Sequence, residues 1–225
     1  MKQTIIKPIA KIFNDFDEKF GIPRQSGRAP SVMSKIVFEP EYRSYDALRG
    51  LEGFSHLWLI FDFSLSHRKG FTPLVRPPRL GGNQKVGVFA SRSPFRPNSL
   101  GLSSVKLINI IDSPEGPVLI VSGADLLSGT PIYDIKPYLP FTDCHLDAVG
   151  GFADDKLSHR LTVKFACDES VLKDETLSAL KECLSDDPRP SYQDDGRVYG
   201  MKFANHNVKF TVENDQLTVL AIEKI

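Results

Sequence analysis

Short strand-like segments fill most of the first 165 residues of this chain, and no long helical pattern separates them. The run Phe54–Leu65 is almost continuously apolar, which is typical of a strand buried on both faces. Ser158–Ala166 alternates apolar and polar residues, with the period of two of a half-buried strand. Strands at this spacing predict a barrel or a sandwich and not a βαβ sheet. Three further segments are short, apolar or β-branched, and bounded by turn-forming residues: Lys85–Ala90, Gly101–Ile111 and Pro117–Gly123.

The pattern changes after residue 166. Ser170–Ser185 places apolar residues near helical spacing, and two acidic residues precede it where they suit a helix N-terminus. Asp187–Pro190 contains two prolines and must end that helix. Arg197–Ile225 predicts a hairpin whose turn lies at Glu213–Gln216.

These patterns together predict a mainly β protein with two domains. We expect a single-sheet, β-barrel-like N-terminal domain over residues 1–155 and a small α/β C-terminal domain over residues 156–225. A chain of 225 residues can bury enough apolar surface to fold without a disulfide or a structural metal.

Several classes of protein are disfavoured by composition. No apolar run approaches the roughly 18 residues of a membrane span, and the N-terminus lacks the features of a secretory signal, so we expect no membrane partner. Three cysteines without C-x-x-C spacing favour reduced thiols and a cytoplasmic location. The five histidines are scattered and complete no ligand set at standard spacing, so no metal site is expected.

The formal net charge of zero hides an uneven distribution of charge. Between Asp62 and Asp112 there is no acidic residue, although eight basic residues occur there. Such segregation creates a local positive field, which favours a partner that carries phosphate, most commonly nucleic acid. The alternative is a basic surface that only keeps the protein soluble.

Motifs of the common nucleotide-binding folds are missing. The sequence contains neither G-x-G-x-x-G nor a P-loop, and Gly81-Gly82-Asn83 precedes a predicted strand instead of a helix. A Rossmann-type site for NAD, for ATP or for a methyl donor is therefore disfavoured.

The segment Gly87–Gly101 is the densest in chemically useful residues. It combines Arg92, Arg96 and Asn98 with Phe95 and two prolines, directly after a predicted strand. Two arginines beside an aromatic ring suit a phosphate and a stacked base, and the prolines reduce the entropic cost of holding them in place. The alternative is a surface loop whose arginines bind backbone carbonyls.

An ordered set of short motifs covers essentially the whole chain: Ile22–Gln25, Gly50–Trp58, Val75–Gly82, Gly87–Asn98, Gly129–Pro131, Asp134–Pro140 and Asp187–Tyr192. In this set the chain resembles the TrmO (TsaA-like) family of tRNA adenine N6-methyltransferases. The resemblance implies an enzyme that uses S-adenosyl-L-methionine on a β-barrel. It also implies a homodimer with the cofactor site near the subunit interface. The implied substrate is N6 of threonylcarbamoyladenosine at position 37, in the anticodon stem-loop of threonine tRNA.

The resemblance also carries over cofactor contacts. At two places the sequence departs from the family pattern: Ser64-Leu65 replaces a usual His-Gln pair, and Ser128 replaces a usual aspartate. We expect cofactor binding to be retained with altered polar contacts. The implied contacts are Pro23, Arg24, Gln25, Ser64, Leu65, Arg92, Leu102, Asp125, Leu126, Leu127 and Ser128.

Methyl transfer to an exocyclic nitrogen benefits from alignment of donor and acceptor and from a hydrogen-bond acceptor for the N6 proton. We expect Asn98 to be that acceptor, with Asp134 as the second candidate. Arg24 and Arg92 are expected to anchor a carboxylate or a phosphate, and Phe95 or Tyr138 to stack on the adenine. The candidates for RNA contact are Arg79, Arg96, Lys136, Tyr138 and Arg189.

Two other functions stay open from the sequence. A non-catalytic β-barrel module that binds adenosine or RNA is favoured by the departures at residues 64, 65 and 128. A small-molecule hydrolase has candidate residues, but it lacks a G-x-S-x-G nucleophile elbow and a metal set.

Overall fold

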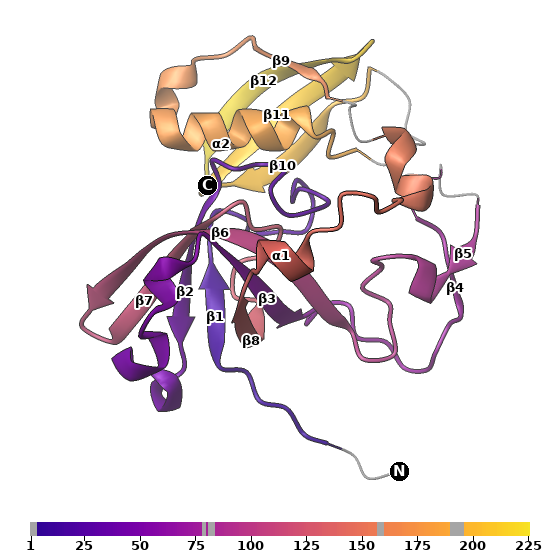
Figure 1. Cartoon of the computed structure of the whole chain (residues 1–225). Coiled ribbons are helices and arrows are strands. Elements are labelled where there is room, and N and C mark those ends of the chain that lie inside the picture. Colours follow the sequence, from indigo (N-terminus) through magenta and orange to yellow (C-terminus); the bar gives the residue numbers. More distant parts are fainter. Residues whose placement is uncertain (1–3, 78–79, 81–83, 157–159, 190–195) are drawn as a thin grey trace.

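The computed structural model of the chain describes residues 4–77, 80, 84–156, 160–189 and 196–225. Six strands close into an antiparallel barrel in the order β1-β2-β7-β6-β3-β8 (Figure 1). The mainly β fold expected from the sequence is confirmed. The barrel strands are β1 (Ala10–Phe13), β2 (Met33–Phe38), β3 (His56–Asp62), β6 (Leu100–Ser113), β7 (Gly116–Ser122) and β8 (Pro131–Pro137).

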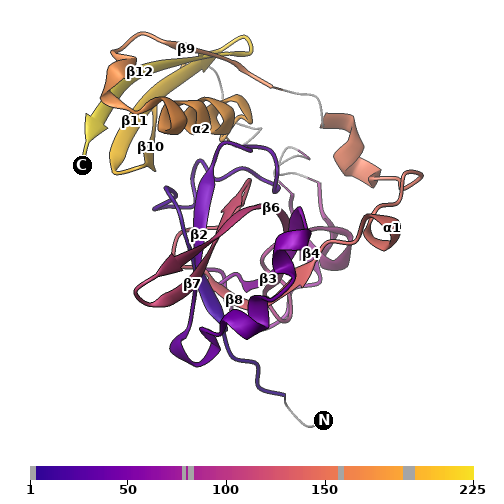
Figure 2. The same ribbon diagram turned by 60° about the vertical axis from the view of Figure 1, so that its left-hand side comes forward.

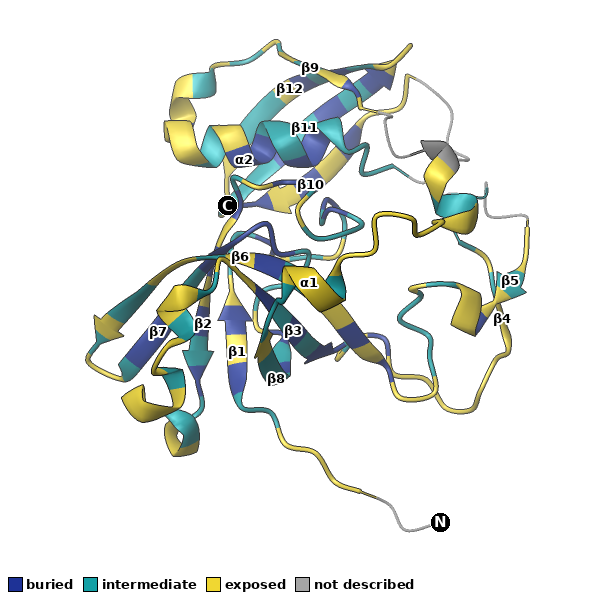
Figure 3. Ribbon diagram, in the orientation of Figure 1, coloured by how far each residue is buried: buried dark blue, intermediate teal, exposed yellow. Residues whose placement is uncertain are grey.

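Alternating side chains fill the barrel. In β3, Leu57, Leu59 and Phe61 are buried in the interior, whereas Trp58 and Ile60 are half-buried on the outer wall (Figure 3). The expectation that Phe54–Leu65 is buried on both faces is therefore wrong for the outer face. A closed barrel of one layer buries only its inward face, and the strand itself ends at Asp62.

The close approach of β3 and β6 requires a glycine. Phe61 and Gly101 are directly opposite each other in the antiparallel ladder. A Cβ atom at Gly101 would lie 2.2 Å from the Phe61 ring, far inside van der Waals contact. Because Gly101 has no side chain, the Phe61 ring can occupy this position inside the barrel.

Short elements occupy the connections between barrel strands. The long connection between β3 and β6 contains a small two-stranded ladder, β4 (Leu74–Val75) with β5 (Val86–Gly87). The 3-10 helices η1 (Pro40–Tyr42), η2 (Tyr45–Leu48) and η3 (Leu51–Gly53) precede β3, and η5 (Val88–Ala90) follows β5. The helix α1 (Pro140–Asp143) and the 3-10 helix η6 (Gly151–Lys156) follow β8.

The C-terminal part is a four-stranded sheet with one helix. The sheet has the order β10-β11-β12-β9, and only the pair β12–β9 is parallel among its described ladders. Asn214 and Asp215 form the expected turn with φ of 45° and 61°, a left-handed backbone that suits a tight hairpin. The elements are β9 (Thr162–Phe165), η7 (Glu169–Val171), α2 (Asp174–Ser185), β10 (Tyr199–Phe203), β11 (His206–Glu213) and β12 (Gln216–Lys224).

A second core joins the two parts of the chain. Phe16, Ala29 and Val32, from the connection between β1 and β2, are buried together with residues of α2 and of the C-terminal sheet. In Figure 1 α2 crosses in front of that sheet, and both lie above the barrel in the two ribbon views (Figures 1 and 2). The C-terminal sheet thus shares its core with a barrel connection. Among the described residues, no helix combines the length and hydropathy that a bilayer crossing needs.

Candidate active site

Three connections leave the barrel at the same end. Because neighbouring barrel strands are antiparallel, the connections β1–β2 (residues 14–32), β3–β6 (residues 63–99) and β7–β8 (residues 123–130) all emerge there. We call this the loop end of the barrel. All the expected cofactor contacts except Leu102 lie in these three connections.

Arg92 and Gln25 meet at the loop end. The Arg92 guanidinium donates a hydrogen bond to the side-chain oxygen of Gln25. Gln25 in turn donates through Nε2 to the backbone oxygen of Arg24 at 2.6 Å. Two segments 67 residues apart in the sequence are therefore in direct contact, as a shared site requires.

Asp125 lies next to the same turn. Its Oδ1 accepts a 2.6 Å hydrogen bond from Ser103 Oγ, and it also accepts from the backbone N–H of Ser26. Burial raises the pKa of Asp125, while the Ser103 hydrogen bond and the charge of Arg92 act in the opposite direction. A carboxylate, an amide and a guanidinium thus gather at one place, which suits a ligand that carries hydroxyl, amino and carboxylate groups.

The rest of the β7–β8 connection is tied to the β1–β2 connection. Ser128 Oγ accepts from the Asn14 backbone N–H at 3.3 Å, and the Leu126 backbone oxygen accepts from Asn14 Nδ2 at 2.9 Å. The Leu126 side chain is buried in the barrel core, and Leu127 is half-buried. At positions 126 and 128 this segment therefore presents backbone and a hydroxyl group, and no carboxylate.

Ser64 and Leu65 are exposed at the loop end. Lys19, which the sequence motifs did not point to, donates from Nζ to the Leu65 backbone oxygen at 2.9 Å and to Ser66 Oγ at 3.0 Å. Leu65, one of the two residues that depart from the family pattern here, is thus bound to the β1–β2 connection through its backbone oxygen. This contact does not depend on the Leu65 side chain.

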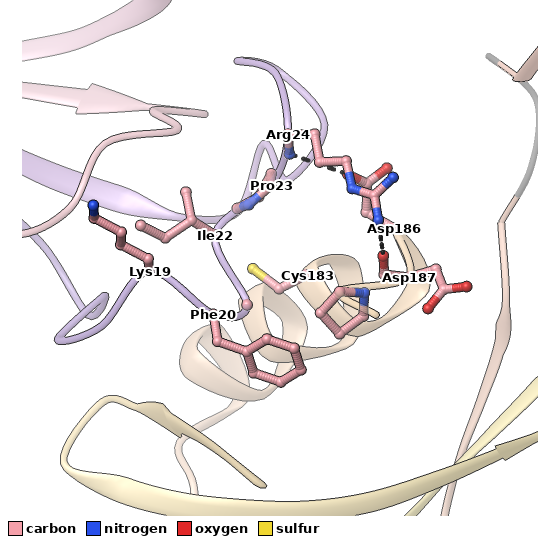
Figure 4. A pocket seen from close by; sticks show the side chains of 10 residues that line it. Lys19, Phe20, Ile22, Pro23, Arg24, Cys183, Asp186 and Asp187 are labelled. Carbon is pink, nitrogen blue, oxygen red and sulfur yellow. Dashed lines mark hydrogen bonds between the residues drawn. The ribbon is translucent and has the colours of Figure 1, made fainter. Parts of the chain in front are cut away.

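Arg24 contacts the segment that follows α2. Its Nη2 donates to the backbone oxygens of Asp187 and Arg189, and its backbone N–H lies 3.4 Å from Asp186 Oδ2 (Figure 4). These contacts border a cavity of about 240 Å³ between the β1–β2 connection and the end of α2, lined by Lys19, Phe20, Gly21, Ile22, Pro23, Arg24, Cys183, Asp186, Asp187 and Pro188. Arg24 and Arg92, both expected to anchor a carboxylate or a phosphate, thus have different protein partners, and that role stays a prediction for each.

The two candidate acceptors lie in different settings. Asn98 is exposed in the connection that leads into β6. Asp134 lies on β8, where its carboxylate contacts Lys136 Nζ at 3.1 Å and accepts from the Ile135 backbone N–H at 2.9 Å. Leu102 and Asp134 both pair with Ile60 of β3, so they share the outer wall of the barrel.

The residues expected to contact RNA also lie in different parts of the molecule. Lys136 is exposed on the outer wall, and Tyr138 packs against Trp58 with ring centroids 5.5 Å apart. Arg96 donates from Nη1 to the backbone oxygens of Ser91 and Val88, so this arginine binds backbone carbonyls of its own loop. Arg189 is largely buried in an ion pair with Asp187 at 2.9 Å, and Arg79 lies outside the described residues.

Other functional side chains at the loop end were not expected. Asp62 is buried and its Oδ1 lies 2.7 Å from His67 Nε2, and the Tyr133 hydroxyl also hydrogen-bonds to Asp62. The Arg68 guanidinium lies 3.5 Å from the centroid of the Phe95 ring and covers one face of it. A carboxylate inside the apolar run 54–65 was the sequence signal for Asp62.

Among the described residues, no group of three or more His, Cys, Asp or Glu side chains is placed to hold a metal ion.

Comparisons with known proteins agree with the geometry. The family model for the tRNA-methyltransferase O N-terminal domain matches residues 11–144, and the model for the TrmO C-terminal domain matches residues 159–225. The chain is 38% identical to a tRNA (adenine(37)-N6)-methyltransferase of Escherichia coli K12, over 99% of each chain. It is 40% identical to a putative S-adenosylmethionine-dependent methyltransferase, RcsF, of Pseudomonas aeruginosa, over 88% of this chain and 87% of that one.

A solved structure shares the whole architecture. The crystal structure of TrmO from Pseudomonas aeruginosa superposes with a TM-score of 0.81 and 32% identity, covering 100% of this chain and 99% of that one. Both family models and full-length similarity in sequence and structure agree with the resemblance seen in the motifs. The chain belongs to the tRNA-methyltransferase O family.

Proposed function

We propose that this protein transfers a methyl group from S-adenosyl-L-methionine to N6 of threonylcarbamoyladenosine at position 37 of threonine tRNA. The enzyme class and the cofactor follow from family membership: the chain is an S-adenosylmethionine-dependent tRNA (adenine-N6)-methyltransferase. The threonylcarbamoyl group and the choice of threonine tRNA are the proposed part. The observation that carries the proposal is the meeting of Gln25, Arg92 and Asp125 at the loop end.

The residues at the loop end fit the cofactor by their chemistry. The exposed Arg92 guanidinium can pair with a carboxylate, and Asp125 can accept from hydroxyl or amino groups. Backbone groups of residues 64–65 and 126–128 can add contacts that do not depend on the altered side chains. When bound, S-adenosylmethionine supplies an electrophilic methyl group on a sulfonium centre.

The chain's own contribution to the reaction is alignment and acceptance of a proton. N6 gains a methyl group and loses its proton, so an acceptor directed at N6–H stabilises the charge that develops on nitrogen. We assign this role to Asn98, which lies between Pro97 and the start of β6. Asp134 is the second candidate, but both of its oxygens already have partners on β8.

The binding of tRNA rests on the basic connection between β3 and β6. Exposed cations there and Lys136 on the outer wall can neutralise phosphates of an anticodon stem-loop. Arg79 stays a candidate. Arg96, Tyr138 and Arg189 act in this proposal through the loops that they hold, since their polar or ring groups already have protein partners. The carboxylate of the threonylcarbamoyl group would find cationic partners on the same surface.

Further parts of the proposal concern assembly and organisation. We propose a homodimer in the cytoplasm, supported by the exposed Leu100 and Leu102 on the outer wall of β6, next to the loop end. We also propose the division into residues 1–155 and 156–225, although residues of the β1–β2 connection belong to the second core.

The decisive experiment is nucleoside analysis of tRNA after incubation with the protein and isotopically labelled methyl donor. Label is expected in N6-methyl-threonylcarbamoyladenosine when threonine tRNA from cells is used, and not when an unmodified transcript is used. Label on plain adenosine 37 of the transcript would contradict the requirement for the threonylcarbamoyl group. Cofactor binding by calorimetry without any methyl transfer would favour the non-catalytic RNA-binding module.

A further inference from the structure

Two phenylalanines form an exposed aromatic pair on the long connection between β3 and β6. The Phe71 side chain is 57% exposed and that of Phe89 is 74% exposed. Their ring centroids lie 6.3 Å apart with an interplanar angle of 25°, so the two rings are stacked side by side in water. Neither ring contributes to either hydrophobic core.

The surrounding backbone holds this pair in place. Phe89 lies in η5, directly after Val88, which is buried and donates its backbone N–H to Pro73 at 2.9 Å. The Val88 backbone oxygen accepts from Ser91 and from the Arg96 guanidinium. The ladder of β4 with β5 connects the two segments that carry the rings. A platform held in this way loses little conformational entropy when a partner binds.

The connection that carries the pair is basic. Arg68, Lys69, Lys85 and Arg92 are exposed on the same connection, which contains no acidic residue. An isologous contact between two copies of this patch would bring cations against cations, which disfavours a second copy as its occupant. Exposed rings among cations match the recognition of single-stranded nucleic acid, in which bases stack on aromatic rings and phosphates are neutralised.

We infer that Phe71 and Phe89 form a stacking platform for an unpaired base of the RNA substrate, separate from the target adenine. This inference rests on the proposed function for the identity of the RNA, since an anticodon loop offers unpaired bases beside position 37. Phe89 also has the Arg96 guanidinium 6.0 Å from its ring centroid, but its side chain stays exposed. Phe95 and Tyr138, the rings expected to stack on the adenine, are only half-exposed: Arg68 covers Phe95, and Trp58 packs against Tyr138. The platform binds the loop and leaves the reacting base to the Asn98 segment.

The test compares binding and not turnover. The probe is a fluorescent anticodon stem-loop of threonine tRNA, with its affinity measured by anisotropy over a range of salt concentrations. Phe71→Ala and Phe89→Ala are each expected to weaken binding about tenfold. Phe89→Leu is expected to behave like Phe89→Ala, and Phe89→Trp to bind like the wild type. Leu220→Ala removes an exposed apolar side chain from the C-terminal sheet and is the control.

Three further measurements distinguish stacking from charge and from assembly. The slope of log affinity against log salt is negative, and its size is expected to stay unchanged in the phenylalanine variants. In Arg68→Ala the size of the slope is expected to fall by about one, because one expected phosphate contact is lost. A stem-loop with abasic sites in the loop has no base to stack on the rings. The wild type and Phe71→Ala are therefore expected to bind this abasic stem-loop equally weakly. Light scattering is expected to give the same mass for all variants.

Phe89→Leu with wild-type affinity, an altered mass in Phe89→Ala, or failure of the wild type to bind the stem-loop would overturn the platform. Failure of the proposed function looks different: the wild type binds the stem-loop with the full dependence on Phe71 and Phe89, but transfers no methyl group to tRNA.

Discussion

Arg28 of the β1–β2 connection and Asp186 at the end of α2 form an ion pair in which Arg28 Nε lies 2.6 Å from Asp186 Oδ1. The Asp186 side chain is only 4% exposed. Nearby, Glu182 accepts from the Ser31 backbone N–H at 2.7 Å and from Ser31 Oγ at 2.8 Å. Asp186 and Glu182 therefore hold residues 28–31, directly after the proposed cofactor contacts Pro23–Gln25, and so connect the C-terminal part of the chain to that segment.

Removing this pair is expected to destabilise the protein strongly. Asp186→Ala removes a buried carboxylate that pairs with Arg28 and accepts from the Arg24 backbone N–H, and should lower the free energy of unfolding by about 3–5 kcal/mol. Urea denaturation followed by circular dichroism measures the change. Glu223→Gln, which removes an exposed ion pair with Lys209, is the matched control and should cost less than about 1 kcal/mol. Equal effects of the two variants would show that the Asp186 pair is not buried in solution.

Arg92 and Arg24 should have different roles although both belong to the expected cofactor set. Arg92 is exposed and contacts Gln25, so Arg92→Ala should weaken cofactor binding by about tenfold to a hundredfold with little change in stability. Arg24 binds the backbone of the C-terminal segment, so Arg24→Ala should mainly lower the melting temperature. Calorimetry with S-adenosylmethionine and thermal melts separate the two effects. The reverse pattern would contradict the assignment.

The Asp125 carboxylate is expected to lower the stability of the fold at neutral pH and to strengthen cofactor binding. Its pKa is raised above its ordinary value of 3.8, chiefly by burial, so the folded state favours the protonated carboxyl group. This contribution to stability is complete below that ordinary value and is lost as pH rises through the folded-state pKa. At neutral pH the ionised carboxylate therefore destabilises the fold, and Asp125→Asn should melt at the same or a higher temperature while binding cofactor about tenfold more weakly or worse.

The sign of this effect can be checked by the pH dependence of the melts. The advantage of Asp125→Asn over the wild type should be largest near neutral pH and should shrink as pH falls through the raised pKa, where the wild-type carboxyl group becomes protonated. Ser103→Ala, which removes the hydrogen bond to the carboxylate, should lower stability at neutral pH by about 1 kcal/mol. An advantage that grows as pH falls would contradict the raised pKa.

Substitution of Asn98 should reduce turnover and leave the affinity for the cofactor unchanged. If its side-chain oxygen accepts the N6 proton's hydrogen bond, Asn98→Ala should reduce kcat about a hundredfold, by analogy with the loss of one directed hydrogen bond in other active sites. The KM for S-adenosylmethionine should be unchanged. Single-turnover methylation of native threonine tRNA measures the step directly. Wild-type turnover in Asn98→Ala, together with a loss in Asp134→Asn, would transfer the role to Asp134.

Gly101 should be intolerant of any side chain. A methyl group there would overlap the Phe61 ring, so Gly101→Ala should destabilise the barrel by about 1–3 kcal/mol. Gly53→Ala is the control, because a Cβ atom at that position would meet nothing within 4 Å among the described residues beyond its own chain neighbours. The double variant Gly101→Ala with Phe61→Leu should recover part of the loss, since the smaller side chain leaves room for the methyl group.

Much of the architecture follows from local patterns in the sequence. Alternation in β9, the turn at residues 213–216 and the helix that ends at Ser185, before Pro188, depend on neighbouring residues, and all three are present in the structure. The expected strand Lys85–Ala90 is wrong beyond Gly87, because Val88–Ala90 forms the 3-10 helix η5. The segments around Gln25, Arg92 and Asp125, which meet at the loop end, were identified through the resemblance to the family.

The direction of each side chain was decided only by the tertiary structure. Arg24 and Arg92 have the same chemistry, but Arg24 donates to the backbone that follows α2, whereas Arg92 contacts Gln25. Asp62 lies in an apolar run, and only the pairing of β8 with β3 brings Tyr133 to its carboxylate. Local periodicity determines which residues can form a strand. Which groups meet depends on closure of the barrel and on the docking of α2, because these contacts join residues that are far apart along the chain.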